Sequence, residues 1–222
     1  MSIQIQGNGG VVAEVDGTTY RALRVTMRPV DYGALGQYRI AMLSGTMAAG
    51  LASAAEIYQA RWTQNPNLAI IWGVSVDGMS GSATAFTAGF ANLTLTIARA
   101  WLADGSGGTS ATLTGNNQKL RTSMATTLMS AVRISATAAL SAGTKTLDAQ
   151  PEGQISFCMN TNVSVNYMSM IGLYGSLSLE DGGNVAPIVL AQNEGVVVRA
   201  TVPATGTWQF GVTMAWTEVA SY

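Results

Sequence analysis

The chain of 222 residues contains no histidine and a single cysteine, so few of its side chains could do catalytic chemistry. Histidine is the commonest general base and the commonest protein metal ligand, and its absence excludes the Ser-His and Cys-His arrangements. A single cysteine also excludes an internal disulfide framework. Because Cys158 lies in an alternating run of apolar and polar residues, we interpret it as a small packing residue.

Carboxylates remain as residues with catalytic potential, and the chain has 12 of them. A glycosidase needs two carboxylates that face each other across a cleft. The only adjacent pair, Glu180-Asp181, lies in a predicted turn, and so do Asp16, Asp77 and Asp104. An all-oxygen metal site would need a closed ligand set, which is not visible here. The sequence therefore predicts no catalytic residues, no metal site and no cofactor, as expected for a protein that is not an enzyme.

A glycine-rich segment, Asp104-Gly105-Ser106-Gly107-Gly108, has the composition of a phosphate-binding or calcium-binding loop. It lacks the lysine that a phosphate loop requires. It also lacks the ligand spacing and the closing glutamate of a calcium loop. We therefore interpret it as a plain turn.

Arg21, Arg24 and Arg28 form the densest basic cluster in the chain. They could contact an acidic neighbour and so act as assembly contacts. Alternatively, they could form a solvated strand edge whose charges discourage further strand pairing. The formal net charge of −1 argues against nucleic-acid binding, which would show a basic balance with interleaved aromatic residues.

The whole chain is poor in charge, with 10% charged residues against about 25% in an ordinary soluble domain. A surface of Thr, Ser, Asn, Gly and Ala is poorly protected from self-association. The composition therefore favours a protein whose surface is buried against copies of itself or a partner; a stable monomer is the alternative. Neither an export signal nor a sufficiently apolar membrane segment is recognised, so we expect synthesis in the cytoplasm and no membrane partner.

The elements that must position these residues are predicted to be strands. Asp16-Gly17 lies between two strand-like runs, and this dipeptide is the strongest short sequence signal for a β-hairpin. The glycine-rich stretch before these runs predicts an N-terminal arm. We expect residues 1–30 to form this arm and hairpin and residues 31–222 to form one domain. Further strands are predicted at Gln37–Met42, Glu56–Trp62, Leu68–Val76, a long strand ending at Trp101, Val132–Ser135, Thr144–Leu147, Gln154–Tyr167 and Ile171–Leu179.

Two of these strands have predicted faces, assigned from strict alternation. In Glu56–Trp62, Tyr58 and Trp62 should share one face, and Ile57, Gln59 and Arg61 the other. In the long strand, Leu93, Leu95, Ile97, Arg99 and Trp101 should point the same way.

Leu68–Val76 should be buried on both faces and end at Asp77-Gly78. Leu43–Ala55 is predicted as a small-residue loop that holds at most one helical turn, because its glycines oppose a helix.

The clearest pattern is at the C-terminal end, where Gly195–Val202 and Thr207–Val219 each alternate. The short connection Pro203-Ala204-Thr205-Gly206 carries turn residues, which predicts an antiparallel hairpin with a four-residue loop. Many short strands separated by turns, with no segment of helical period, predict an all-β fold. We expect an antiparallel β-sandwich, jelly-roll-like, with the N-terminal arm and hairpin attached.

Several stretches resemble segments of small virion structural proteins of tailed bacteriophages. They are Gly36–Arg39 with Ser44–Gly50, Ala55–Trp62, Ala138–Asp148 and Pro187–Glu218. The resemblance implies a virion component with a β-sandwich, commonly trimeric. It provides no catalytic residues to transfer.

From this resemblance and the low charge we expect a capsid decoration or cement protein on the outer capsid surface. Its partners would be itself, as a homotrimer, and the major capsid protein, whose subunits it would bridge. One alternative is a tail or tail-fibre component that contacts host-surface glycans through Tyr32, Tyr38, Tyr174 and Tyr222. A non-viral, self-assembling β-protein is a third hypothesis.

Overall fold

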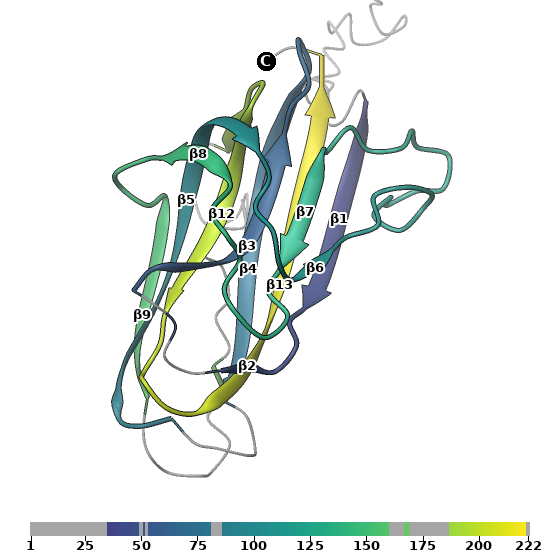
Figure 1. Ribbon diagram of the computed structural model, residues 1–222. Coiled ribbons are helices and arrows are strands. Elements are labelled where there is room, and N and C mark those ends of the chain that lie inside the picture. The colour runs from purple at the N-terminus through teal and green to yellow at the C-terminus, as the bar shows by residue number, and fades with distance from the viewer. Residues whose placement is uncertain are drawn as a thin grey trace, which may run out of the picture. The chain divides into compact units, whose positions relative to one another are not determined.

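The computed structural model describes residues 35–48, 51, 53–80, 86–159, 167–168 and 187–220; for 78–80, 157–159 and 167–168 only the backbone is described. All of them belong to the unit Gly33–Tyr222. They form strands and loops without a helix (Figure 1), and hence no helix that could cross a membrane. The predicted all-β, antiparallel β-sandwich is confirmed.

Two antiparallel sheets make up the described part of the chain. The six-stranded sheet contains β1 (Gly36–Leu43), β2 (Met47–Ala48), β4 (Leu68–Ser80), β10 (Tyr167–Met168), β11 (Ile188–Leu190) and β13 (Thr207–Val219), with β13 between β1 and β4. The seven-stranded sheet contains β3 (Ala55–Trp62), β5 (Gly89–Ala103), β6 (Thr109–Ser110), β7 (Ala131–Ile134), β8 (Thr144–Leu147), β9 (Gly153–Met159) and β12 (Glu194–Thr201), with β12 between β3 and β5.

The sheets pack against each other over one shared hydrophobic core. On β13 the alternating residues predicted to be buried are buried, from Trp208 to Trp216. Side chains of the other sheet belong to the same core cluster: Tyr58, Trp62, Leu93, Leu95, Val196 and Val198. Burying one large apolar side chain contributes about 1.5–3 kcal/mol, so this cluster holds the two sheets together.

The predicted hairpin between the last two strands is wrong. β12 pairs with β3 and β5, whereas β13 pairs with β1 and β4 in the other sheet. The turn-rich segment 202–206 therefore carries the chain from one sheet to the other (Figure 1). Alternation identified the apolar face of each strand correctly. It could not decide whether the two faces lie side by side or opposite each other across the core.

Other predicted strands are present with small shifts, including β1, β3, β7 and β8. β4 does not end at Asp77-Gly78 as predicted, because its pairing with β13 continues to Ser80. Leu43–Ala55 contains the end of β1 and the short strand β2, and its described residues form no helix. β9 covers the first part of the predicted strand Gln154–Tyr167.

Several predictions fall outside the described residues. These are the arm and hairpin of residues 1–30 with Arg21, Arg24 and Arg28, and the strand Ile171–Leu179. The division into residues 1–30 and 31–222 therefore stays a prediction.

Candidate functional site

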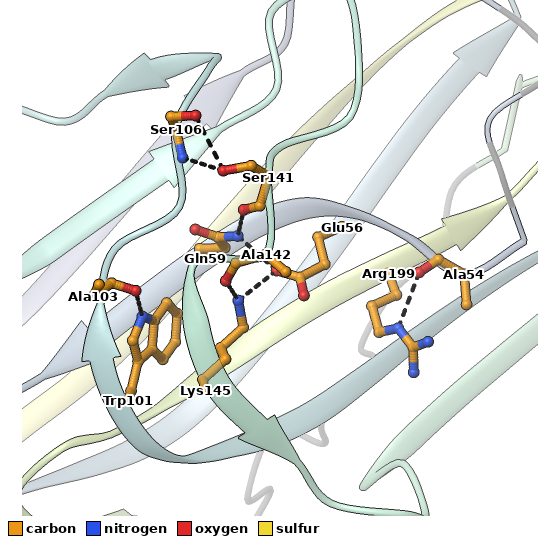
Figure 2. A network of polar contacts seen from close by, with 10 residues as sticks. All are labelled: Ala54, Glu56, Gln59, Trp101, Ala103, Ser106, Ser141, Ala142, Lys145 and Arg199. Atoms are coloured by element: carbon orange, nitrogen blue, oxygen red, sulfur yellow. Dashed lines mark hydrogen bonds and ion pairs between the residues drawn. The ribbon is translucent and has the colours of Figure 1, made fainter.

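A buried amine, a carboxylate and an amide meet on the outer face of the seven-stranded sheet (Figure 2). We call Lys145, Glu56 and Gln59 the amine–carboxylate–amide cluster. Glu56 and Gln59 come from β3, and Lys145 comes from β8. The Lys145 side chain is only 1% exposed, and Glu56 and Gln59 are also buried. Burial is unusual for these residue types and requires that each polar group is paired.

One carboxylate oxygen joins the three side chains. Glu56 Oε2 lies 2.8 Å from Lys145 Nζ and accepts a hydrogen bond from Gln59 Nε2 at 2.5 Å. Gln59 Nε2 also donates to the Ser141 carbonyl at 2.8 Å, and Lys145 Nζ donates to the Ala142 carbonyl. Both amide protons of Gln59 are therefore used, which fixes the plane of its amide.

The ammonium group of Lys145 also lies over an aromatic ring, 4.6 Å from the centroid of Trp101. A cation over the face of an indole is attracted by the ring quadrupole. Trp101 is itself held by a hydrogen bond from its Nε1 to the Ala103 carbonyl at 3.0 Å. It packs against Ala98 and Val197 in a small apolar cluster separate from the main core. Lys145 is thus enclosed by an acid on one side and an indole on the other.

A β-bulge in β3 places Glu56 in this cluster. Tyr58 pairs with Val198 while Glu56 pairs with Arg199, so one residue of β3, Ile57, has no counterpart on β12. The extra residue shifts the alternation, and residues three apart share the outer face. Ile57 accordingly belongs to the main core together with Tyr58. The predicted placement of Ile57 on the face opposite Tyr58 is wrong for this reason.

A second irregularity places Trp101. Ala100 has φ of +48°, and the pairing of β5 with β8 shifts register between Arg99 and Ala103. The change turns Trp101 onto the outer face beside Ala98, whereas Leu95 belongs to the main core. The predicted common face for Leu95 and Trp101 is therefore wrong.

Close approaches of the backbone complete the site. A Cβ added at Gly105 would lie 2.0 Å from the Ser141 carbonyl oxygen and 2.6 Å from Gln59 Oε1. A Cβ added at Gly195 would lie 2.6 Å from the Trp101 ring. Ser141 is also tied to Ser106, whose backbone N–H donates to its hydroxyl at 2.6 Å. The glycine-rich loop thus packs on the cluster, and a side chain at Gly105 or at Gly195 would collide with atoms of the site.

A second buried carboxylate, Glu218 on β13, is surrounded by neutral donors. Its Oε1 accepts hydrogen bonds from the Thr127 hydroxyl and from Trp216 Nε1 at 3.1 Å. The backbone N–H of Leu128 lies 3.0 Å from both carboxylate oxygens. Burial raises the pKa of Glu218 above its ordinary value, although these hydrogen bonds oppose the shift. The arrangement attaches the segment before β7 to the six-stranded sheet.

The residues singled out from the sequence are distributed over the described structure. Asp104, in the glycine-rich loop, pairs with Arg61 at 2.9 Å. Tyr38 is buried and stacks on Trp216, so it cannot serve as the exposed glycan platform considered above. Cys158 lies in β9, and its side chain is outside the described residues, as are Glu180 and Asp181. Over the described ranges, no group of three His, Cys, Asp or Glu side chains could hold a metal ion.

Sequence reasoning missed the amine–carboxylate–amide cluster. One signal was present: Glu56 and Gln59 are polar residues that alternate with core-forming residues in the same strand, and Lys145 is one of only two lysines in the chain. Strict alternation separated Glu56 from Gln59, and nothing local connects them to Lys145. The bulge and the tertiary contact with β8 bring the three together.

Comparison with known proteins does not assign the chain to a family: no family model matches it, nor does any curated protein or solved structure.

Proposed function

We propose that this chain is a structural component of a bacteriophage virion, a decoration or cement protein that covers and bridges capsid subunits. The resemblance noted in the sequence supports the class. The stretches that carry it form all or part of β1, β2, β3, β8 and β11 to β13. All of these strands belong to the two sheets of the sandwich. Related structural proteins are expected to share the strands that build their common fold.

The observation that carries the proposal is the outer face of the six-stranded sheet. Its central row runs across three strands, from Ala41 on β1 through Thr213 on β13 to Ser75 on β4. Ala41 is exposed, and Thr213 and Ser75 are half-buried. Small uncharged side chains of this kind let another protein surface approach closely, with little charge to desolvate.

Two charged side chains flank the central row, one in the next outward-facing row on either side of it. On β1, β4 and β13 the outward-facing charged side chains among the described residues are Arg39 and Asp77. A large apolar side chain, Leu43, lies at the end of β1 and is 69% exposed. In the proposed assembly this face packs on the major capsid protein. Each contact is modest, and many copies on one shell make the attachment firm through multivalency.

Quantitative mass spectrometry of purified virions that contain this chain tests the proposal. A decoration protein is expected in a fixed, high ratio to the major capsid protein, whereas a few copies per virion would contradict the cement role. Sedimentation of the purified chain is expected to show a homotrimer. A lone subunit at high concentration would contradict self-association.

A variant pair tests the face itself. Thr213→Glu places a charge in the middle of the row and is expected to abolish binding to particles that lack the chain, with folding retained. Thr112→Glu, at an exposed loop residue, is the matched control and is expected to bind normally. Equal binding of both variants would exclude this face. Binding to host glycans instead of to particles would favour a tail or fibre role.

A further inference from the structure

We propose that Lys145 and Gln59 become joined by an intramolecular isopeptide bond, with Glu56 as the group that moves the protons. The inference rests on the amine–carboxylate–amide cluster alone and holds whether or not the chain is part of a virion. An amine, a primary amide and a carboxylate are the three groups that such a transamidation needs.

The geometry favours the reaction because the two reacting groups share one partner. Lys145 Nζ and Gln59 Nε2 both lie on Glu56 Oε2, at 2.8 and 2.5 Å. The two nitrogens are therefore no farther apart than these two hydrogen bonds laid end to end. Because both reacting groups are held in one site, the reaction is intramolecular, and the attack requires Lys145 Nζ to move to about 3–3.5 Å from Cδ of Gln59.

The surroundings restrict the groups and exclude competitors. Lys145 is bounded by the Trp101 ring, and the Gln59 amide is held by the Ser141 carbonyl. The Lys145 side chain is 1% exposed and Gln59 is 3% exposed, so water has little access to the amide. A site closed to water suppresses hydrolysis of the amide and leaves the amine as the available nucleophile.

Glu56 is placed to take a proton from the attacking amine and to give a proton to the leaving nitrogen. It takes a proton from Lys145 Nζ, which then attacks Cδ of Gln59. As the Nζ–Cδ bond forms and the Cδ–Nε2 bond breaks, Glu56 passes a proton to Nε2, which leaves as ammonia. Of the three protons on the ammonium group, one stays on the new amide, one leaves with the ammonia and one remains on Glu56. Charges balance, and no oxidant or cofactor is needed.

The product would connect two strands that are not neighbours. In the seven-stranded sheet, β12 and β5 lie between β3, which carries Gln59, and β8, which carries Lys145. A covalent bond across them would prevent β8 from peeling away from the sheet. Unlike a disulfide, this link would resist reducing agents.

Intact-mass measurement of the purified full chain tests the proposal directly. The expected mass is that of the sequence less one ammonia. Trypsin is then expected to leave the bond after Lys145 uncut and to release residues 40–61 joined to residues 134–199, because Arg39, Arg61, Arg133 and Arg199 are the flanking cleavage sites. The wild-type chain at its full sequence mass, with Lys145 cleavable, would overturn the proposal.

Two variants assign the roles. Glu56→Gln keeps the size of the side chain and removes the proton acceptor, and Lys145→Arg keeps a cation but removes the attacking amine. Both are expected at full sequence mass, with residues 40–61 recovered as a free peptide. Lys119→Arg changes the other lysine and is expected to lose ammonia as the wild type does. Loss of ammonia that persists in Lys145→Arg would also overturn the proposal.

Discussion

Glu56 and Glu218 are both withdrawn from water in this sandwich, but their partners differ. Glu56 meets a cation, Lys145, and an amide. Glu218 meets a hydroxyl, an indole N–H and a backbone N–H, all of them neutral. The first site contains a matched pair of charges and depends on both members. The second contains a single carboxylate that neutral donors stabilise only in part, so its protonation should respond to pH. Two predictions test this difference directly, a third tests the packing around the first site, and a fourth compares its buried ion pair with an exposed one.

The largest effect is expected from Lys145→Met. Removing one partner of a buried ion pair leaves the other charge uncompensated, which typically costs about 3–5 kcal/mol, and here any covalent link would be lost as well. Chemical denaturation should show the loss. Lys119→Met, at a half-buried lysine on a loop, should change the free energy of unfolding by less than about 0.5 kcal/mol. Adding Glu56→Leu to Lys145→Met should recover the part of the loss that comes from the unpaired buried carboxylate, but not the part that comes from a lost covalent link.

Gly195→Ala should destabilise the same site by a different route. The new Cβ would lie 2.3 Å from the Ala60 carbonyl oxygen and 2.6 Å from the Trp101 ring. Overpacking of this kind costs about 1–3 kcal/mol. Gly211→Ala is the matched control on β13, where the nearest atom lies 3.6 Å away, so its melting temperature should not fall. Equal melting temperatures for the two variants would contradict the close packing around Trp101.

For Glu218 we expect a pH dependence of stability. The pKa of Glu218 in the folded chain is raised above the ordinary value of 4.5 that applies in the unfolded chain. At a pH between these two pKa values, the folded chain therefore binds more protons than the unfolded chain. The contribution of Glu218 to stability is therefore fully present at or below about pH 4.5 and is lost as pH rises through the folded pKa. Glu218→Gln should remove this slope while changing stability by about 1 kcal/mol, since the oxygen can still accept hydrogen bonds.

Unfolding measured across pH checks this prediction. Glu152→Gln changes an exposed glutamate and serves as the control that should keep the wild-type profile. An unchanged profile in Glu218→Gln would show that another group produces the slope.

The smallest effect is expected at the exposed ion pairs of Arg99, whose side chain is 49% exposed. It contacts Asp148 at 2.9 Å and Glu194 at 2.6 Å. Exposed pairs contribute about 0–1 kcal/mol and are screened by salt. Arg99→Ala should therefore lower stability by at most about 1 kcal/mol, and the difference should shrink in high salt. A loss as large as that of Lys145→Met would contradict the contrast between buried and exposed pairs.

The fold class could be predicted because period-two alternation is a local property of the sequence. It identified the buried face of β13 from Trp208 to Trp216 without error. Alternation failed at Ile57 and Trp101, where an extra residue or a positive φ changes which way the side chains point. It also failed for the connection between β12 and β13, because pairing between sheets is a long-range property.

By itself, the sequence determined that the chain is built from strands, that their apolar faces must be covered, and that histidine chemistry is excluded. The tertiary structure decided which strands share a sheet and which polar residues meet inside it. Lys145, Glu56 and Gln59 lie far apart or on opposite predicted faces in the sequence. Only a bulge and the packing of β8 over Trp101 bring them to one oxygen atom. The physical reason is that burial of a charge is decided by the partners available in space, and these partners belong to different strands.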